Sequence, residues 1–194
     1  MSEATNESRK PRVAVYCASS PSLDQKYLDL AHQLGTGIAQ RGWDLVWGGG
    51  KTSMMGAVAQ GARENGALTF GVIPEKLISV EFADGASSEL HVVKDMRERK
   101  GLIENMSDAF IALPGGIGTL EELFEIWVGR YLGFHAKPVV VCDPFDVYTP
   151  MQVALQHLKK LEFMKSGQEE KIAWCTDVAT TLDTLSQTLP TISL

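Results

Sequence analysis

The sequence has few of the residues on which disulfides, metal centres and membrane spans depend. Its 194 residues include only three cysteines, Cys17, Cys142 and Cys175, and no two of them form a C-x-x-C pair. Each lies in or beside an apolar run, so we expect buried, reduced thiols rather than redox or metal chemistry. The four histidines are scattered, so no metal site is predicted. No apolar run reaches the roughly 18 residues of a membrane span.

Positive charge is also scarce. The chain has 18 basic and 24 acidic residues and a net charge of -6, so a uniform basic surface for nucleic acid is not expected. A local basic pocket for a small anion remains open. The first residues, MSEATNESRKPR, are polar and lack the apolar core of a secretory signal. We expect a disordered tail over residues 1–11, a single domain over 12–194, and a cytoplasmic location.

Short apolar runs alternate with longer amphipathic segments along the chain. This alternation predicts an α/β domain with a mostly parallel sheet and helices on both faces. Residues 75–95 are less regular, and we expect a loop over one edge of the sheet with a short strand inside it. The expected strands are 12–17, 43–47, 68–73, 91–94, 109–113, 137–143 and 171–177. The expected helices are 23–42, 54–65, 96–107, 120–132, 151–164 and 178–189.

A first glycine run, WGGGKTSMMG at 47–56, follows a predicted strand and resembles a phosphate-binding P-loop. That motif requires G-x-x-x-x-G-K-[ST], and its first glycine would fall on Leu45, inside the strand. The pattern therefore argues against a P-loop. Three consecutive glycines exceed what a tight turn needs, so we expect Gly48, Gly49 and Gly50 to bring bare backbone close to a ligand.

A second glycine run, LPGGIGTLEE at 113–122, also follows a strand. Gly115, Gly116 and Gly118 leave the backbone bare, and the Thr119 hydroxyl is predicted to cap the next helix. A helix N-terminus offers free N–H groups and a partial positive charge, which suit a monophosphate. Ligands of parallel α/β sheets bind beyond the carboxyl ends of the strands, where both glycine runs lie.

Charged residues flank the second glycine run on both sides. Glu121 and Glu122 follow it, and either carboxylate is placed to reach the sugar of a bound nucleotide, or simply to favour the helix dipole. Glu125 shares a face with Glu121, whereas Glu122 points about 100° away. Upstream, DMRERKG supplies Arg97, Arg99 and Lys100. They indicate either a solvated helix face or an anion partner, and an arginine there can grip a phosphate bidentately.

Taken together, these motifs resemble those of the LONELY GUY (LOG) family. MRERK and SDAFIALPGGIGTLEE match its M-x-x-R-K and P-G-G-x-G-T-x-x-E signatures, and VYCASS, GGGKTSMMG and GVIPEKL resemble its other segments in the same order. The resemblance covers roughly residues 12–145. It implies a Rossmann-like fold, a homodimer with active sites near the subunit interface, and no metal or organic cofactor. It also implies hydrolysis of the N-glycosidic bond of N6-substituted adenosine 5′-monophosphate, which releases the base and ribose 5-phosphate.

The resemblance also assigns roles to individual residues. Arg99 and Glu122 are the implied catalytic pair, and Lys100 and Glu81 the implied substrate contacts. Gly116, Gly118 and Thr119 would hold the phosphate, and Gly115 and Glu121 are further expected substrate contacts. Ser20 and Gly48–Gly50 would line the same cleft. The chain departs from the family pattern at Ser53, Arg97 and Val128, and the last of these is expected to alter the base pocket.

Two alternatives remain on the sequence alone. A protein of this fold can bind or carry a nucleotide or pterin cofactor without cleaving it, and a related hydrolase can act on a plain purine nucleotide. The joint presence of Arg99, Lys100 and Glu122 favours an enzyme. The aromatic residues of FEIWVGRYLGF (124–134) recur at spacing 3 to 4 and extend beyond one helix face, which predicts a packed partner subunit.

Overall fold

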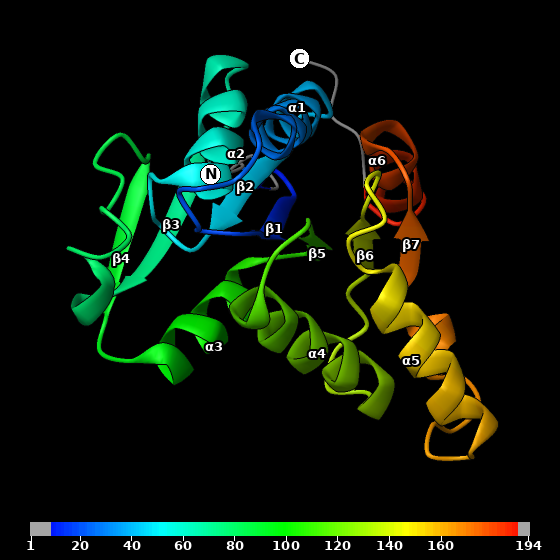
Figure 1. Ribbon diagram of the computed structural model, residues 1–194. Helices are drawn as coiled ribbons and strands as arrows, with labels where there is room; N and C mark the ends of the chain where they lie inside the picture. The colour runs from blue at the N-terminus through cyan, green and yellow to red at the C-terminus, as the bar shows by residue number, and fades with distance from the viewer. Residues whose placement is uncertain (1–8, 190–194) are drawn as a thin grey trace, which may run out of the picture.

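The computed structural model describes residues 9–189 and places a seven-stranded parallel sheet between two layers of helices (Figure 1). The strands lie in the order β4-β3-β2-β1-β5-β6-β7, and all six pairings are parallel. This confirms the predicted fold class. The strands are β1 (Arg12–Tyr16), β2 (Asp44–Trp47), β3 (Thr69–Pro74), β4 (Glu89–Val93), β5 (Ala109–Ala112), β6 (Val139–Cys142) and β7 (Ala173–Cys175).

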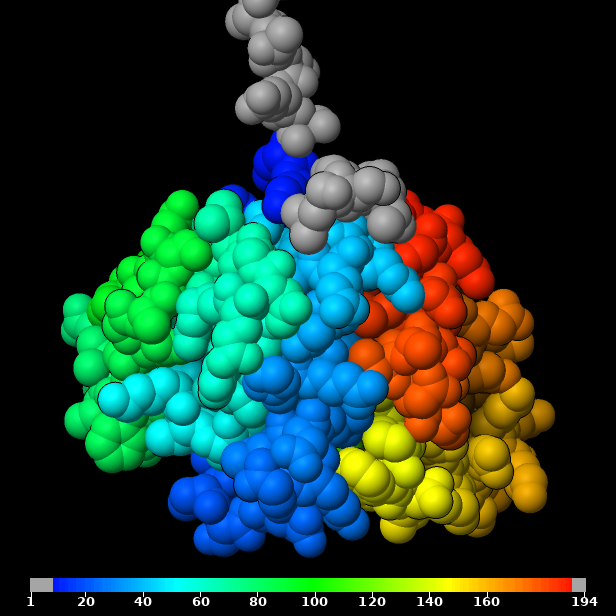
Figure 2. Space-filling model, turned by 90° about the horizontal axis from the view of Figure 1, so that it is seen from above, coloured from blue at the N-terminus to red at the C-terminus, as the bar shows by residue number. Residues whose placement is uncertain are grey.

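One layer consists of α1 (Gln25–Gln40), α2 (Ser53–Glu64) and α6 (Val178–Ser186). Figure 2 shows this layer from outside, with α1 between α2 and α6. Alternate side chains of β1 point into it, including Val13 and Val15, and pack with Leu34 of α1 and Val58 of α2 in one apolar core. The three cysteines lie in this core and are all buried and free, as predicted.

The other layer consists of α3 (Met96–Met106), α4 (Ile117–Leu132) and α5 (Thr149–Lys160). The remaining β1 side chains, such as Ala14 and Tyr16, face it and pack with Ile103 of α3 and Leu123 of α4. Strands buried on both faces are apolar at nearly every position, which explains why they were recognisable as short continuous runs. No helix of residues 9–189 is long and apolar enough to cross a membrane.

Residues 9–11, the end of the expected tail, contact the domain. Arg9 forms two hydrogen bonds of 2.7 and 2.8 Å with the Asp108 carboxylate, and the Pro11 carbonyl accepts one from the Asp44 N–H. Residues 1–8 of that tail lie outside the described residues. Within the domain the largest boundary difference is at α5, which ends at Lys160, four residues before the expected end. α4 begins at Ile117, three residues before the expected start, because its first turn runs through Gly118.

The sheet changes winding direction between its neighbouring strands β1 and β5. The chain leaves β1 for α1 on one face, and it leaves β5 for α4 on the opposite face. The two departing loops are linked by a hydrogen bond from the Ala18 N–H to the Pro114 carbonyl, 3.3 Å. Such a switch point opens a crevice at the carboxyl edge of the sheet, where ligands of α/β proteins bind.

Candidate active site

A cleft of about 380 Å³ opens at this switch point. The loop after β1 forms one wall and the start of α4 another, while α3 and the loop after β3 close the far end. Of the predicted site residues, Ser20, Glu81, Arg99, Gly116, Gly118, Thr119, Glu121 and Glu122 line it. The other lining residues are Cys17, Ala18, Ser19, Met55, Leu77, Met96 and Ile117.

Arg99 is the buried cation of the cleft, with 5% of its surface exposed. Its Nε donates to the Val72 carbonyl at 3.1 Å, and Nη2 donates to the Gly48 carbonyl at 2.8 Å. The same Nη2 lies 3.2 Å from Oε2 of Glu81, so the charge is paired as well as hydrogen-bonded. A buried guanidinium is tolerated only with such partners, and here they fix its orientation.

Gly48, Gly49 and Gly50 of the first glycine run are not among the residues that line the cleft, and Gly48 packs against Arg99. A Cβ on Gly48 would stand 2.0 Å from Nη2 of Arg99, and one on Gly50 would meet Cε of Met55 at 2.6 Å. Gly49 has φ +74°, a conformation that favours glycine. The missing side chains of Gly48 and Gly50 admit Arg99 and the neighbouring loop. Direct contact of Gly48–Gly50 with a ligand stays a prediction.

That neighbouring loop carries Glu81 and is tied to the glycine run by backbone hydrogen bonds. The Lys51 N–H donates to the Phe82 carbonyl at 2.9 Å, and the Asp84 N–H donates to the Gly49 carbonyl at 2.8 Å. Asp84 is itself buried and forms an ion pair of 2.8 Å with Arg63 of α2. Glu81 thus reaches Arg99 from a loop whose base is held by α2.

The N-terminus of α4 faces the cleft without a side-chain cap. Gly116 is the N-cap residue, so the predicted cap at Thr119 is wrong. Thr119 lies inside the first turn and is buried, and its hydroxyl occupies the space where a Cβ on Gly115 would stand. The first-turn N–H groups at Ile117 and Gly118 have no acceptor within the helix, because the first four N–H groups of any helix lack one. They remain available to an anion in the cleft.

Glu122 projects from the second turn of α4 into the cleft. Burial raises the pKa of its carboxyl group to about 7, while the nearby Arg99 lowers it and Glu121 and Glu81 raise it. A carboxyl that titrates near neutrality is suited to proton transfer. Because the helix begins at Ile117, Glu121 and Glu122 lie beyond its first turn. The helix dipole falls off within that turn, so it explains neither acid.

Lys100 is not among the lining residues. It pairs with Glu121, and its Nζ lies 2.9 Å from Oε2 of Glu125. One lysine joining both carboxylates confirms that Glu121 and Glu125 share a helix face. The two carboxylates raise the pKa of Lys100, chiefly through the Glu121 hydrogen bond. Lys100 therefore bridges α3 and α4 and leaves Glu121 at the rim of the cleft. Its contact with substrate stays a prediction.

The apolar lining was not predicted from the sequence. Leu77, Met96 and Ile117 come from three separate segments, and Ile117 is 89% exposed. Met96 begins MRERK and Ile117 lies inside the second glycine run. Only the charged residues and the glycines of these motifs predicted a ligand contact. Of the departures from the family pattern, Val128 lies outside this lining and is 46% exposed on the outer face of α4, so it does not shape the cleft.

The P-loop alternative finds no support in the structure. Leu45 is buried in β2, which excludes the first glycine of a P-loop. No group of three His, Cys, Asp or Glu side chains in residues 9–189 is arranged to hold a metal ion.

Comparison with known proteins gives consistent results at the level of sequence. Residues 55–185 match a family described as "Possible lysine decarboxylase". The cytokinin riboside 5′-monophosphate phosphoribohydrolase of Mycobacterium tuberculosis is 48% identical over 160 residues, 82% of this chain and 85% of that protein. The proteins of the same name from Mycobacterium marinum and Rhodococcoides fascians are 43% and 38% identical, covering 89% and 86% of this chain and 91% and 84% of theirs.

Solved structures show that the fold extends to more distant proteins. The molybdenum cofactor binding protein of Rippkaea orientalis matches with a TM-score of 0.71 and 23% identity, over 93% of this chain and 98% of that one. The molybdenum cofactor carrier protein of Chlamydomonas reinhardtii matches with a TM-score of 0.70 and 24% identity, over 92% and 98%. Both similarities concern the fold alone.

Proposed function

Because the chain belongs to the LONELY GUY family of cytokinin riboside 5′-monophosphate phosphoribohydrolases, we propose that its cleft hydrolyses N6-substituted adenosine 5′-monophosphates. Water cleaves the N-glycosidic bond, and the products are the free adenine-type base and ribose 5-phosphate. The observation that carries this is the meeting of Glu122, with a pKa near 7, and the buried Arg99 beside an uncapped helix N-terminus.

We place the phosphate at the start of α4. Residues 116–119 line the cleft, and Gly116 and Gly118 have open space where side chains would stand. A phosphate there gains charge-assisted hydrogen bonds and the favourable end of the helix dipole without a metal ion. Ser20, from the loop after β1, lines the same cleft and can add a hydroxyl donor.

Cleavage then takes place one helical turn further along. Loss of the base develops positive charge on the ribose, which an ionised Glu122 stabilises while accepting a proton from the attacking water. Arg99 remains protonated and holds the phosphate or a ribose hydroxyl, since Glu81 and two carbonyls fix its position. Glu81 and Glu121 complete the polar lining.

A product assay tests the proposal. Incubation with AMP, GMP, CMP and N6-isopentenyl-AMP, followed by chromatography, should release free base from the adenine nucleotides. Glu122→Gln should lower turnover by about 10²–10³-fold, because one preorganised charge is lost. Glu125→Gln, three residues further along and outside the cleft lining, is the matched control. Parental turnover by Glu122→Gln contradicts the role, and AMP that is bound but intact favours the binding or carrier alternative.

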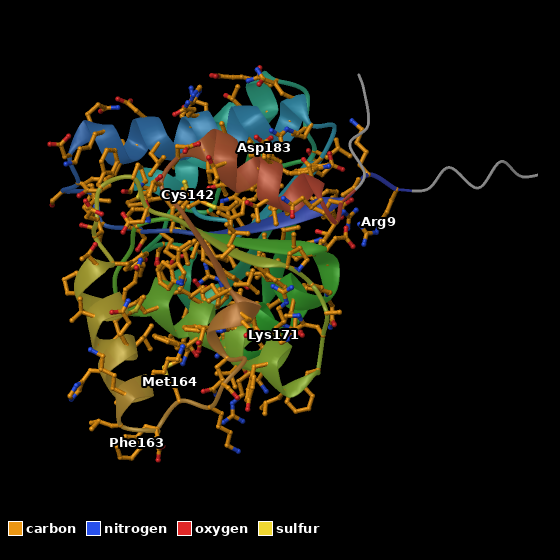
Figure 3. All side chains as sticks on the ribbon, turned by 90° about the vertical axis from the view of Figure 1, so that its right-hand side faces the viewer. Arg9, Cys142, Phe163, Met164, Lys171 and Asp183 are labelled. Carbon is orange, nitrogen blue, oxygen red and sulfur yellow. The ribbon has the colours of Figure 1, made fainter. Side chains whose placement is uncertain are left out.

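We also propose a homodimer built on the outer face of α4. Val128, Leu132 and Phe134 are 46%, 57% and 80% exposed there, whereas Trp127 is buried. Phe163 and Met164, which follow α5, lie at the lower end of the molecule in Figure 3. Phe163 is 77% exposed and lines a groove with Val128. Light scattering at micromolar concentration should give twice the monomer mass, and Leu132→Lys should shift it toward the monomer.

The cysteines and the net charge of the chain support proposals on its location and its partners. Three free, buried cysteines suit a reducing compartment, so we propose a cytoplasmic location. The net charge of -6 disfavours nucleic acid as a partner. Fractionation of cells that express the tagged chain checks the first point, and a gel-shift assay at low salt checks the second.

A further inference from the structure

Beyond the catalytic cleft lies a second hollow, of about 640 Å³, at the carboxyl ends of β3 and β4. Its walls contain three basic side chains, Lys76, Lys94 and Arg97, and a single acidic one, Asp95. All three cations are exposed, and within residues 9–189 none of them forms a salt bridge. In a chain with a net charge of -6, such a cluster is a local exception.

The acids near this hollow are engaged by the backbone. Asp95 caps α3 and accepts from the N–H groups of Arg97 and Glu98, and this lowers its pKa. Oε2 of Glu98 accepts from the Lys94 N–H at 2.8 Å. Glu75, beside Lys76, is exposed and does not line the hollow. The basic groups therefore remain available to an external anion.

The hollow adjoins the catalytic cleft, and Leu77 and Met96 line both. The proposed phosphate site follows β5, whereas Leu77 follows β3. Three strand spacings separate these strands in the sheet order, or about 14 Å at roughly 4.8 Å per spacing. A nucleotide held by its phosphate at α4, with its ribose near Arg99 and Glu122, directs its base toward Leu77 and Met96. A group on the base then extends into the hollow.

We propose that this hollow binds a carboxylate carried at the end of the N6 substituent, so that AMP derivatives with acidic N6 groups are substrates. The proposal rests on the proposed function and specifies its substrate class. The reaction is unchanged: water adds to the ribose carbon, the N-glycosidic bond breaks, and the N6-carboxyalkyl adenine leaves with a proton. Arg97 offers a planar fork that matches a carboxylate, and the lysines add point charges.

The test compares two nucleotides of nearly equal size, N6-(3-carboxypropyl)-AMP and its uncharged amide N6-(3-carbamoylpropyl)-AMP. At low salt we expect kcat/KM to be about tenfold higher for the carboxylate, equivalent to about 1.4 kcal/mol. The preference should shrink as salt screens the exposed charges. In the triple variant Lys76→Gln, Lys94→Gln, Arg97→Gln the ratio should fall to near one. Lys26→Gln, on α1, should keep the parental ratio.

Ratios are taken within each variant, so a general loss of activity cancels. Equal kcat/KM values in the parent protein, or a preference that survives in the triple variant, would overturn the proposal. Turnover of AMP distinguishes a failure of the proposed function from a failure of the acidic substrate class. If no adenine is released from AMP, the proposed function fails. If adenine is released but the carboxylate is not preferred, only the acidic substrate class fails.

Discussion

The Nη2 atom of Arg99 lies 2.8 Å from the carbonyl oxygen of Gly48, at a position where any Cβ on Gly48 would approach that nitrogen to 2.0 Å. The side chain from α3 therefore depends on the missing side chain 51 residues earlier. This contact gives the glycine run a role that does not require a P-loop. The run resembles one, but Leu45 stands where the first P-loop glycine would be.

Gly48→Ala is expected to displace Arg99 and separate it from Glu81. The loss of one oriented charge predicts a fall in kcat/KM of about 10²-fold. Gly101→Ala is the matched control, because nothing lies within 4 Å of a Cβ there, on the same helix as Arg99. Steady-state kinetics on AMP checks both variants. Full activity in Gly48→Ala would show that the Arg99 position is not required.

The rate should depend on pH through Glu122. Its raised pKa of about 7 means that the carboxylate form, which stabilises the ribose cation, is lost as the pH falls below that value. We therefore expect kcat/KM to decrease about tenfold per pH unit below the midpoint and to level off above it. Glu122→Gln should lack this midpoint, and only titration of the substrate phosphate near pH 6 should remain. An unchanged profile in that variant would assign the midpoint to another group.

Neighbouring charges should move this midpoint in opposite directions. Glu121 raises the pKa of Glu122 and Lys100 lowers it. Glu121→Gln is accordingly expected to shift the midpoint of the kcat/KM profile to lower pH, and Lys100→Met to shift it to higher pH. The two variants control for each other, since both break the same ion pair. Shifts of the same sign would mean that α4 moves when the bridge is lost.

The buried Asp84 should stabilise both the fold and the loop that carries Glu81. Asp84→Asn weakens the ion pair with Arg63 in a buried setting, which predicts a loss of about 1–3 kcal/mol in the free energy of unfolding. Asp183→Asn breaks the exposed pair with Arg41, which should cost less than about 1 kcal/mol. Urea unfolding measures both. A lower kcat in Asp84→Asn alone would show that the loop positions Glu81, and equal stabilities would remove the anchoring role.

Ser53 begins α2 with φ 54°, a left-handed conformation that costs an L-residue about 1–2 kcal/mol. Its hydroxyl is buried without a hydrogen-bond partner among residues 9–189. Ser53→Gly is expected to raise the free energy of unfolding by about 1 kcal/mol, because the strain is relieved. Ser53→Ala removes the hydroxyl but keeps the Cβ, so its gain should be smaller. Thermal unfolding decides, and a larger gain in Ser53→Ala would contradict the strain argument.

The fold was largely predictable because its signals are local. Seven apolar runs and six amphipathic segments correspond to the seven strands and six helices, and the strand–helix alternation dictates parallel pairing. The start of α4 was misplaced because Gly118 is a poor helix former, so the sequence favoured a loop as far as Thr119. The tertiary setting overrides that preference, since the bare turn faces the cleft.

The site was predictable only in part, because several roles depend on contacts between distant segments. Arg99 and Glu122 were singled out by their motifs, but the ion pairs of Lys100 were not predicted, since nothing in MRERK shows that α4 brings Glu121 and Glu125 to it. The packing of Arg99 against Gly48 was not predictable for the same reason. Leu77 and Met96 could have been suspected only because they lie at the end of GVIPEKL and the start of MRERK.

The reversal of winding between β1 and β5 has a consequence for the diversity of this architecture. The opening exists because two adjacent strands send their chains to opposite sides, so its location follows from chain path and not from any side chain that lines it. Proteins with the same chain topology have an opening at the same place in the sheet, even when few of their residues are identical. The side chains around that opening can therefore differ from one protein to another. In this chain Arg99 of α3 and Glu122 of α4 are the charged groups to which we assign catalysis at that opening.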